Sequence, residues 1–165
     1  MEKEFIHLIN SHRGLLYKIC NLYCDEAEDR KDLFQEIVLQ LWKAYPNFRK
    51  ESSISTWMYR IGLNTAISNF RKASKGIFQT SMQDEVFQVP DPDHFTQDNG
   101  RIAVLHQAIG KLNTIEKAVI MLYLEEKSYE EMAAILGISK SNVGVKLNRI
   151  KSNLEKTIKT HHYES

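Results

Sequence analysis

The sequence predicts an all-α fold: two small helical domains joined by a flexible acidic linker. Apolar residues recur at three- and four-residue spacing toward both ends of the chain, and no stretch shows convincing strand-like alternation. Between them, residues 76–100 break the pattern, because Pro90 and Pro92 are incompatible with a helix and the acidic residues there have no Lys or Arg neighbours. We therefore expect domains at 1–75 and 101–160, followed by a tail at 161–165.

The composition is that of a soluble globular protein, with 42% hydrophobic and 26% charged residues. The formal net charge of +1 does not identify a partner, since basic faces can be balanced by an acidic segment. The sequence has no apolar run long enough to span a membrane and no signal-peptide core, so we expect no membrane insertion and a cytoplasmic location. Cys20 and Cys24 form neither a disulfide framework nor a metal site, and we expect bystander thiols.

Three helices are expected in the first domain. The first runs from Phe5 to about Tyr23. The second follows the charged stretch 25–31 and is ended by Pro46, which lacks a backbone donor. The third begins at a serine cap, Ser53 or Ser55, and ends in basic residues near Lys75.

The second domain begins with a helix from Ile102 to Leu112. Asn113 and Glu116 resemble a capping box that opens the next helix, and Ser128 and Glu131 resemble a better one. Gly137 closes the short helix that follows, and a cap at residue 139 opens the last helix.

Residues 128–154 together predict a helix-turn-helix. Gly137 supplies the left-handed turn, small Ala133 allows the two helices to cross closely, and the inward positions are apolar: Met132, Leu136, Ile138, Val143 and Leu147. The outward face of the last helix offers side chains suited to base edges and phosphates: Lys140, Ser141, Asn142, Val145, Lys146, Asn148 and Arg149. The alternative is an ordinary solvated helix, but a capped helix, a glycine turn and a capped basic helix occur here in succession.

The first domain mixes aromatic and basic residues in the way that suits unstacked single strands. Its aromatic members are Trp42, Tyr45, Phe48, Trp57, Tyr59 and Phe70, close to Arg49, Lys50, Arg60, Arg71 and Lys72. The alternative is that the aromatic side chains form the core, and we expect this for Trp42, Trp57 and Phe70.

Two segments resemble a known family. DLFQEIVLQLWKAYPNFRKESSISTWMYRIGLNTAISNFRK is similar to region two of bacterial RNA polymerase sigma factors of the extracytoplasmic-function class. LNTIEKAVIMLYLEEKSYEEMAAILGISKSNVGVKLNRIK is similar to region four of the same proteins. The two motifs occur in the family's order, with a linker between them, and the resemblance covers nearly the whole chain.

The resemblance implies partners and contact residues. Asp32, Gln35 and Glu36 match positions that dock on the clamp helices of the largest subunit of core RNA polymerase, and region four implies contact with the polymerase flap. The loop 49–54 and Asn64 match positions that capture a flipped base of the -10 element. We therefore expect contacts to the -10 element from Arg49, Lys50, Ser52, Ser53, Arg60, Asn64, Arg71 and Lys72.

The resemblance also implies that Ser141, Asn142, Val145, Lys146, Asn148 and Arg149 read the duplex -35 element. Gly144 departs from the family, in which many members carry a larger, often basic residue there. Asn64 could instead make a local hydrogen bond inside its helix, and the acidic linker could be a plain solvated tether.

We interpret the chain as a sigma factor that directs core polymerase to promoters and promotes their melting, with an anti-sigma factor as a further partner. No cofactor, metal site or catalytic residue is expected, since Asp32 and Glu36 have no nucleophile, metal-ligand cluster or phosphate loop beside them. The alternatives are a stand-alone helix-turn-helix regulator and a nucleic-acid enzyme.

Overall fold

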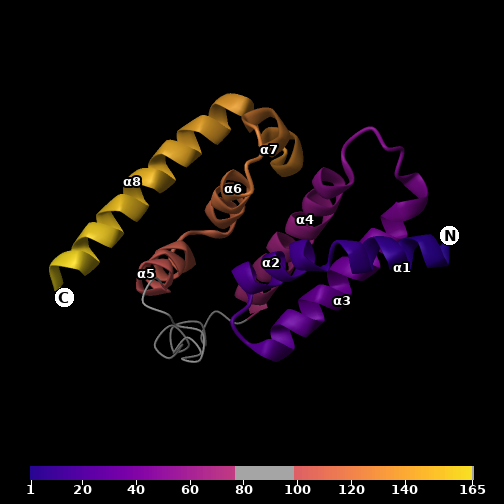
Figure 1. Ribbon diagram of the computed structural model, residues 1–165, viewed down its shortest axis with the longest axis horizontal. Helices are drawn as coiled ribbons and strands as arrows, with labels where there is room; N and C mark the ends of the chain where they lie inside the picture. Colours follow the sequence, from indigo (N-terminus) through magenta and orange to yellow (C-terminus); the bar gives the residue numbers. More distant parts are fainter. Residues whose placement is uncertain (77–98, 165) are drawn as a thin grey trace. The chain divides into compact units, whose positions relative to one another are not determined.

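The structure is a computed structural model that describes residues 1–76 and 99–164. Every regular element in these ranges is helical, which confirms the predicted all-α class (Figure 1). The elements are α1 (Glu2–Ser11), α2 (Arg13–Tyr23), α3 (Ala27–Ala44), the 3-10 turn η1 (Tyr45–Asn47), α4 (Ile54–Gly76), α5 (Asn99–Gly110), α6 (Thr114–Leu124), α7 (Tyr129–Leu136) and α8 (Lys140–Glu164). They gather in two compact units, a first unit built from α1–α4 and a second built mainly from α5–α8. Most of the predicted acidic linker, residues 77–98, lies outside the described residues.

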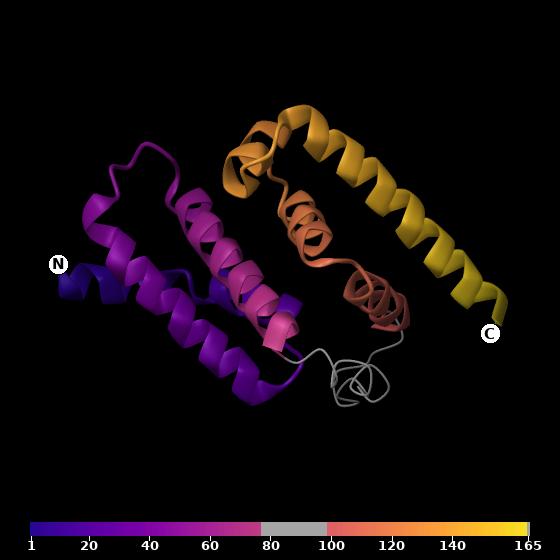
Figure 2. The same cartoon turned by 180° about the vertical axis from the view of Figure 1, so that it is seen from behind.

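In the first unit α2, α3 and α4 pack against one another, and Figure 2 shows α3 and α4 side by side. Their apolar stripes meet in a core whose fully buried members include Leu16, Ile19, Ile37, Leu41, Met58 and Leu63. Gly62 of α4 lies against Ile19 of α2. A Cβ atom there would be 2.7 Å from Cδ1 of Ile19, so glycine is what permits this approach.

The predicted single helix from Phe5 to Tyr23 is wrong, because the chain breaks at His12. The backbone of His12 has φ −119° and ψ 24°, which ends α1 before α2 begins. Two side chains contact carbonyl oxygens in the last turn of α1. The Ser11 hydroxyl donates to the His7 carbonyl oxygen at 2.8 Å, and His12 Nδ1 lies 3.0 Å from the Leu8 carbonyl oxygen. Gly14, which has low helix propensity, follows the break.

The end of α3 and the start of α4 follow the predicted signals, whereas α3 begins at Ala27, inside the charged stretch that was expected to precede it. α3 ends before Pro46, which lies in η1. Of the two candidate caps for α4, Ser53 is the correct one: its Oγ accepts from the amide of Thr56 at 3.2 Å, whereas Ser55 lies inside the helix.

In the second unit α5 and α6 both pack against α8 (Figure 1), with a core that includes Val119, Leu122, Met132, Val143, Leu147 and Ile150. Asn113 and Glu116 form a complete capping box at the start of α6. α8 continues to Glu164, so most of the predicted tail is helical, and α5 begins at Asn99, inside the predicted linker.

Candidate nucleic-acid interfaces

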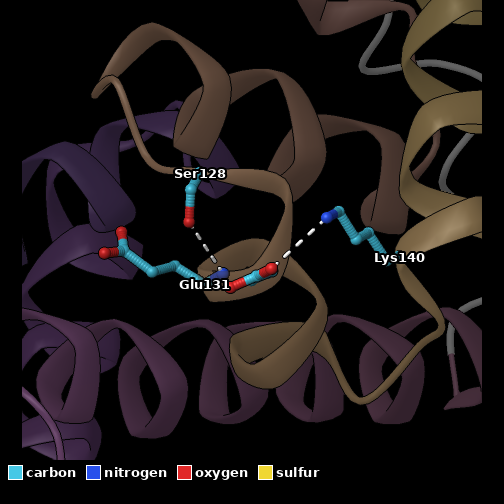
Figure 3. Close-up of polar contacts among 4 residues, drawn as sticks. Ser128, Glu131 and Lys140 are labelled. Carbon is cyan, nitrogen blue, oxygen red and sulfur yellow. Dashed lines mark hydrogen bonds and ion pairs between the residues drawn. The ribbon is translucent and has the colours of Figure 1, made fainter.

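The segment predicted as a helix-turn-helix consists of α7, a tight turn and α8. Ser128 caps α7, with its Oγ accepting from the amide of Glu131 at 3.1 Å (Figure 3). Gly137 adopts φ +70° and donates its amide to the Ala133 carbonyl at 2.8 Å. Ser139 then caps α8 by accepting from the amide of Asn142 at 3.0 Å. Capping residues on both sides of one left-handed glycine therefore fix the start of α8 relative to α7.

The cap at Ser128 differs from the prediction in one respect. Figure 3 shows the carboxylate of Glu131 directed away from Ser128, so the structure shows only one half of the expected box. The complete box is the one at Asn113. The inward positions also differ in depth: Met132, Val143 and Leu147 are buried, whereas Leu136 and Ile138 are half-buried. Ile135, which the sequence reading left out, is buried as well.

Six of the seven predicted -35 residues share one side of α8. With about 3.6 residues per turn, Ser141, Val145, Asn148 and Arg149 lie opposite the buried stripe of Val143, Leu147 and Ile150, and Asn142 and Lys146 lie at its flank. Lys146 is half-buried and the others are exposed, including the apolar Val145 at 56%. We call this set the reading face: Ser141, Asn142, Val145, Lys146, Asn148 and Arg149. It offers amide, hydroxyl and cationic groups together with one apolar contact, as base edges and phosphates require.

Lys140 lies outside the reading face. Its Nζ is 3.3 Å from Oε1 of Glu130, an ion pair that joins the start of α8 to α7 (Figure 3). Both side chains are largely exposed, so the pair contributes little to stability.

Gly144 lies beside the ring of Tyr129. A Cβ atom at Gly144 would be 3.6 Å from Cε2 of Tyr129, an ordinary van der Waals contact. The fold therefore does not require glycine at this position of α8, although Tyr129 covers the place that a larger side chain would occupy.

In the first unit, Arg60, Asn64 and Arg71 are exposed and lie along one side of α4, which we call the α4 stripe. The spacings of four and seven residues align them on the helix surface. Trp57 precedes Arg60 by one turn on the same side. Lys72 belongs to the same helix, but its side chain lies outside the described residues.

The loop before α4 carries the remaining predicted -10 residues, Arg49, Lys50, Ser52 and Ser53, all of them exposed. Lys50 has φ +58°, in the left-handed region that a residue with a Cβ atom seldom adopts. Ser53 serves as the cap of α4, so its hydroxyl already has a structural role.

The expectation that Trp42, Trp57 and Phe70 are core residues is wrong for two of them. Trp42 is 41% exposed and Phe70 is 44% exposed. Trp57 is half-buried, with its ring centroid 4.6 Å from that of Phe48 and 6.4 Å from that of Tyr45. Trp42 packs by one side on Phe5 of α1, at 5.0 Å between centroids. Tyr59, in contrast, is buried.

The predicted polymerase-docking residues lie together on α3, where Asp32 and Gln35 are exposed and Glu36 is half-buried. Gln40 Nε2 donates to Glu36 Oε1 at 2.9 Å and so holds that carboxylate in place. The sequence reading missed Leu39, which is 44% exposed on the same side of the helix. A signal was present, because Leu39 lies off the buried stripe of Leu33, Ile37 and Leu41.

Neither cysteine makes a site. Cys20 is buried in the core and Cys24 is half-buried, and the two form no disulfide. Burial raises the pKa of the Cys20 thiol to about 11, which makes it a poor nucleophile near neutral pH. The described residues include no group of His, Cys, Asp and Glu side chains placed to hold a metal ion. None of the described helices has the length and hydropathy of a membrane span.

Comparison with known proteins agrees with this geometry. The family model for Sigma-70 region 2 matches residues 8–76, and that for Sigma-70, region 4 matches residues 102–154. RNA polymerase sigma factor YlaC of Bacillus subtilis is 33% identical over 135 residues, which cover 79% of this chain and 78% of YlaC. SigV of the same organism is 27% identical over 142 residues, which cover 86% of this chain and 82% of SigV.

Two solved structures share the fold. The sigma factor RpoE in its complex with the anti-sigma factor NepR from Bartonella quintana has a TM-score of 0.71 and 20% identity, covering 96% of both chains. CnrH in complex with the cytosolic domain of CnrY has a TM-score of 0.68 and 21% identity, covering 97% of this chain and 90% of CnrH.

The chain belongs to the sigma-70 family of RNA polymerase sigma factors. Within that family it is a member of the extracytoplasmic-function (ECF) group. It is thus a transcription initiation factor that binds core RNA polymerase and directs it to specific promoters. The alternative of a stand-alone helix-turn-helix regulator is not favoured, because the region 2 model matches this chain in addition to the region 4 model.

Proposed function

We propose that this sigma factor divides promoter recognition between its two units. The reading face of α8 binds the duplex -35 element, and the α4 stripe with the loop 49–53 holds the unpaired -10 element. The observation that carries this proposal is the reading face itself, six side chains on one side of a helix whose start is fixed by Gly137 and Ser139. A helix of this kind fits the major groove.

Substitution in the reading face tests the first half of the proposal. Arg149→Ala should weaken binding of the polymerase holoenzyme to DNA carrying the -35 element about tenfold, because a contact to a base or phosphate is worth roughly 1–3 kcal/mol. Lys111→Ala is the matched control, since Lys111 is exposed on the second unit but lies outside α8. Unchanged binding by Arg149→Ala and by Lys146→Ala would place -35 recognition elsewhere.

The first unit melts the promoter by binding the separated strand more tightly than the duplex. Asn64 offers both a donor and an acceptor to a base edge, while Arg60, Arg71 and Lys72 hold phosphates. Arg49, Lys50, Ser52 and Ser53 form the loop against which the base is held. Asn64→Ala should reduce the fraction of open complex detected by permanganate footprinting, and Asn21→Ala, an exposed asparagine on α2, should not.

The polymerase-docking face consists of Asp32, Gln35, Glu36 and Leu39 on α3, with the clamp helices of the largest subunit as its partner. Leu39 supplies the apolar centre and the polar groups form the rim, the usual arrangement of an interface. The doubly substituted Asp32→Lys, Glu36→Lys protein should no longer co-purify with core polymerase, whereas Glu2→Lys on α1 should. The second unit would bind the polymerase flap in the same complex.

The protein acts by binding and catalyses nothing itself, without a cofactor, in the compartment where polymerase works, the cytoplasm. An anti-sigma factor is a further expected partner, since RpoE was solved with one. Recovery of the tagged protein from cells with a stoichiometric partner that blocks its transcription activity would support this expectation. Recovery of an active holoenzyme alone under every growth condition would contradict it.

A further inference from the structure

α8 is longer than the part of it that carries the reading face. The helix comprises 25 residues, or roughly 37 Å at about 1.5 Å per residue. The reading face occupies residues 141–149, and the region 4 family model matches this chain only as far as residue 154. We call residues 155–164 the distal segment. Figure 1 shows that α8 continues through it as one helix, away from the turn at Gly137.

Two lysines of the distal segment lie on the side of α8 that carries the reading face. Seven residues make about two helical turns, so residues seven apart share a side of the helix. Lys156 follows Arg149 by seven residues. Lys159 follows Ser152 by seven, and Ser152 in turn follows Val145 by seven. All of these side chains are exposed, so the polar side of α8 continues beyond the reading face.

The charge of α8 is unbalanced. Between residues 139 and 159 the sequence has six basic residues and one acidic residue, Glu155. Glu155 Oε1 lies 3.0 Å from Nζ of Lys159, but both side chains are about two-thirds exposed, so water and salt screen this pair. The Lys156 ammonium forms no ion pair with another described residue. The distal segment therefore offers positive charge to an anionic partner.

The dimensions of α8 and of the major groove indicate where these lysines lie when the reading face is bound. The reading face extends from residue 141 to residue 149, roughly 12 Å along the axis, and the groove is about 12 Å wide. Lys156 and Lys159 lie roughly 10 and 15 Å further along the axis than Arg149. A straight helix cannot follow the curved groove over that length, so the distal segment passes over the phosphate backbone at the rim. Lysine suits this place, because its ammonium is a point charge on a flexible stem.

We propose that the distal segment of α8 binds phosphates that flank the -35 element, through Lys156 and Lys159. These contacts lengthen the DNA site of the second unit and add affinity that does not depend on base sequence. The inference rests on the proposed binding of the -35 element by the reading face, because the reading face sets the position of α8 on the duplex.

Two duplex probes separate these contacts from those of the reading face. The short probe contains only the -35 element, and the long probe extends it on each side by one helical turn, about 10 base pairs. Holoenzyme with the doubly substituted Lys156→Gln, Lys159→Gln protein should bind the long probe about tenfold more weakly than wild type at low salt. The slope of log affinity against log salt should fall by about two, one for each phosphate contact. On the short probe the two proteins should bind equally.

A charge-matched control tests whether the effect is local. The Lys111→Gln, Lys151→Gln protein loses the same net charge. However, Lys111 lies outside α8, and the ammonium of Lys151 lies over the Tyr123 ring, 4.3 Å from its centroid. This protein should bind the long probe as wild type does. Glutamine has nearly the helix propensity of lysine, so both double variants should keep the fold, which far-UV circular dichroism verifies.

Several results would contradict the inference. Equal losses by both double variants would indicate a general effect of net charge. Failure of the Lys156→Gln, Lys159→Gln protein to co-purify with core polymerase would indicate an acidic protein surface as the partner. If this protein binds the long probe as wild type does while Arg149→Ala is weaker on both probes, the distal segment binds no DNA and the proposed function stands. If Arg149→Ala and Lys146→Ala also bind both probes normally, the proposed -35 binding by α8 fails as well.

Discussion

The two units present DNA-binding surfaces of different construction. The reading face of the second unit comes from a single helix, and every member of it is positioned by the axis of α8. The proposed surface of the first unit combines α4 with the loop 49–53. A surface on one helix suits the regular groove of a duplex, whereas an assembled surface can follow an irregular single strand. A single substitution in the second unit should therefore weaken mainly its own contact with DNA. A single substitution in the first unit should disturb several contacts of that surface.

The two cores differ as well. Among the described residues, the buried side chains of the second unit are aliphatic or methionine, whereas the first unit also buries Cys20, Tyr23 and Tyr59. Burial raises the pKa of Tyr23 far above its ordinary range, in the same direction as that of Cys20. Both tryptophans, Trp42 and Trp57, also belong to the first unit. The units should thus respond differently to alkali and can be observed separately.

The largest expected effect comes from truncating one buried leucine in the core of each unit. Leu63→Ala and Leu147→Ala each remove a fully buried side chain and should cost roughly 2–5 kcal/mol of unfolding free energy. In urea titrations, Leu63→Ala should shift the transition seen by tryptophan fluorescence. Leu147→Ala should leave that transition in place and shift only part of the far-UV circular dichroism signal. Equal shifts of both signals by Leu147→Ala would show that the units unfold as one.

Alkaline pH should destabilise the first unit selectively. The folded-state pKa of Cys20 is about 11, above the unfolded value of 9.0, so the unfolded chain loses its proton first. Stability is retained below pH 9 and falls as the pH rises toward 11, by up to about 3 kcal/mol. The tryptophan-detected urea midpoint measures this loss. Cys20→Ala should remove the loss of stability between pH 9 and pH 10, whereas the raised pKa of Tyr23 still causes a loss above pH 10. An unchanged slope between pH 9 and pH 10 in that variant would exclude the thiol as its cause.

Two glycines on helices should respond oppositely to alanine. Gly62→Ala places a Cβ atom 2.7 Å from Cδ1 of buried Ile19. Overpacking of about 1–3 kcal/mol is offset in part by a gain of about 1 kcal/mol in helix propensity, so the net cost should be about 2 kcal/mol or less. Gly144→Ala meets only an ordinary contact with Tyr129 and should stabilise α8 by about 1 kcal/mol. Thermal unfolding of both variants measures the difference. A stable Gly144→Ala protein with weakened -35 binding would indicate that the α8 backbone approaches DNA at this position.

The smallest effect is expected at the ion pair between α7 and α8. Glu130→Gln removes a largely exposed partner of Lys140 and should change the unfolding free energy by about 0.5 kcal/mol or less. Because Lys140 is then released, binding of -35 DNA should be equal or slightly tighter at low salt. Anisotropy titrations at two salt concentrations measure this effect. Weaker binding would show that the pair orients α8.

The sequence predicted the second unit better than the first because the signals there are local. Gly137 and the serine caps at 128 and 139 each act within a few residues, so the turn and the reading face followed from spacing. Lys140 stays a predicted -35 contact, but its ion pair with Glu130 could not be foreseen from spacing, because Glu130 comes from another helix. The half-formed box at Ser128 depends on the orientation of one side chain, which the residue types do not determine.

In the first unit the errors share a tertiary origin. The break at His12 interrupts an apolar pattern that spacing alone reads as continuous. Trp42, Phe70 and Leu39 are exposed because the packing of the helices leaves those sides uncovered. Of these features, only the exposure of Leu39 left a periodic signal, because Leu39 lies off the buried stripe of α3.

The most direct test of the division between the two surfaces compares Arg149→Ala with Asn64→Ala on two DNA probes. One probe is a duplex -35 element and the other a forked fragment with an unpaired -10 element, both titrated with holoenzyme. Arg149→Ala should lose about tenfold in affinity on the duplex probe only, and Asn64→Ala should lose affinity on the forked probe only. Equal losses of both variants on both probes would contradict the assignment of duplex and single-strand binding to separate units.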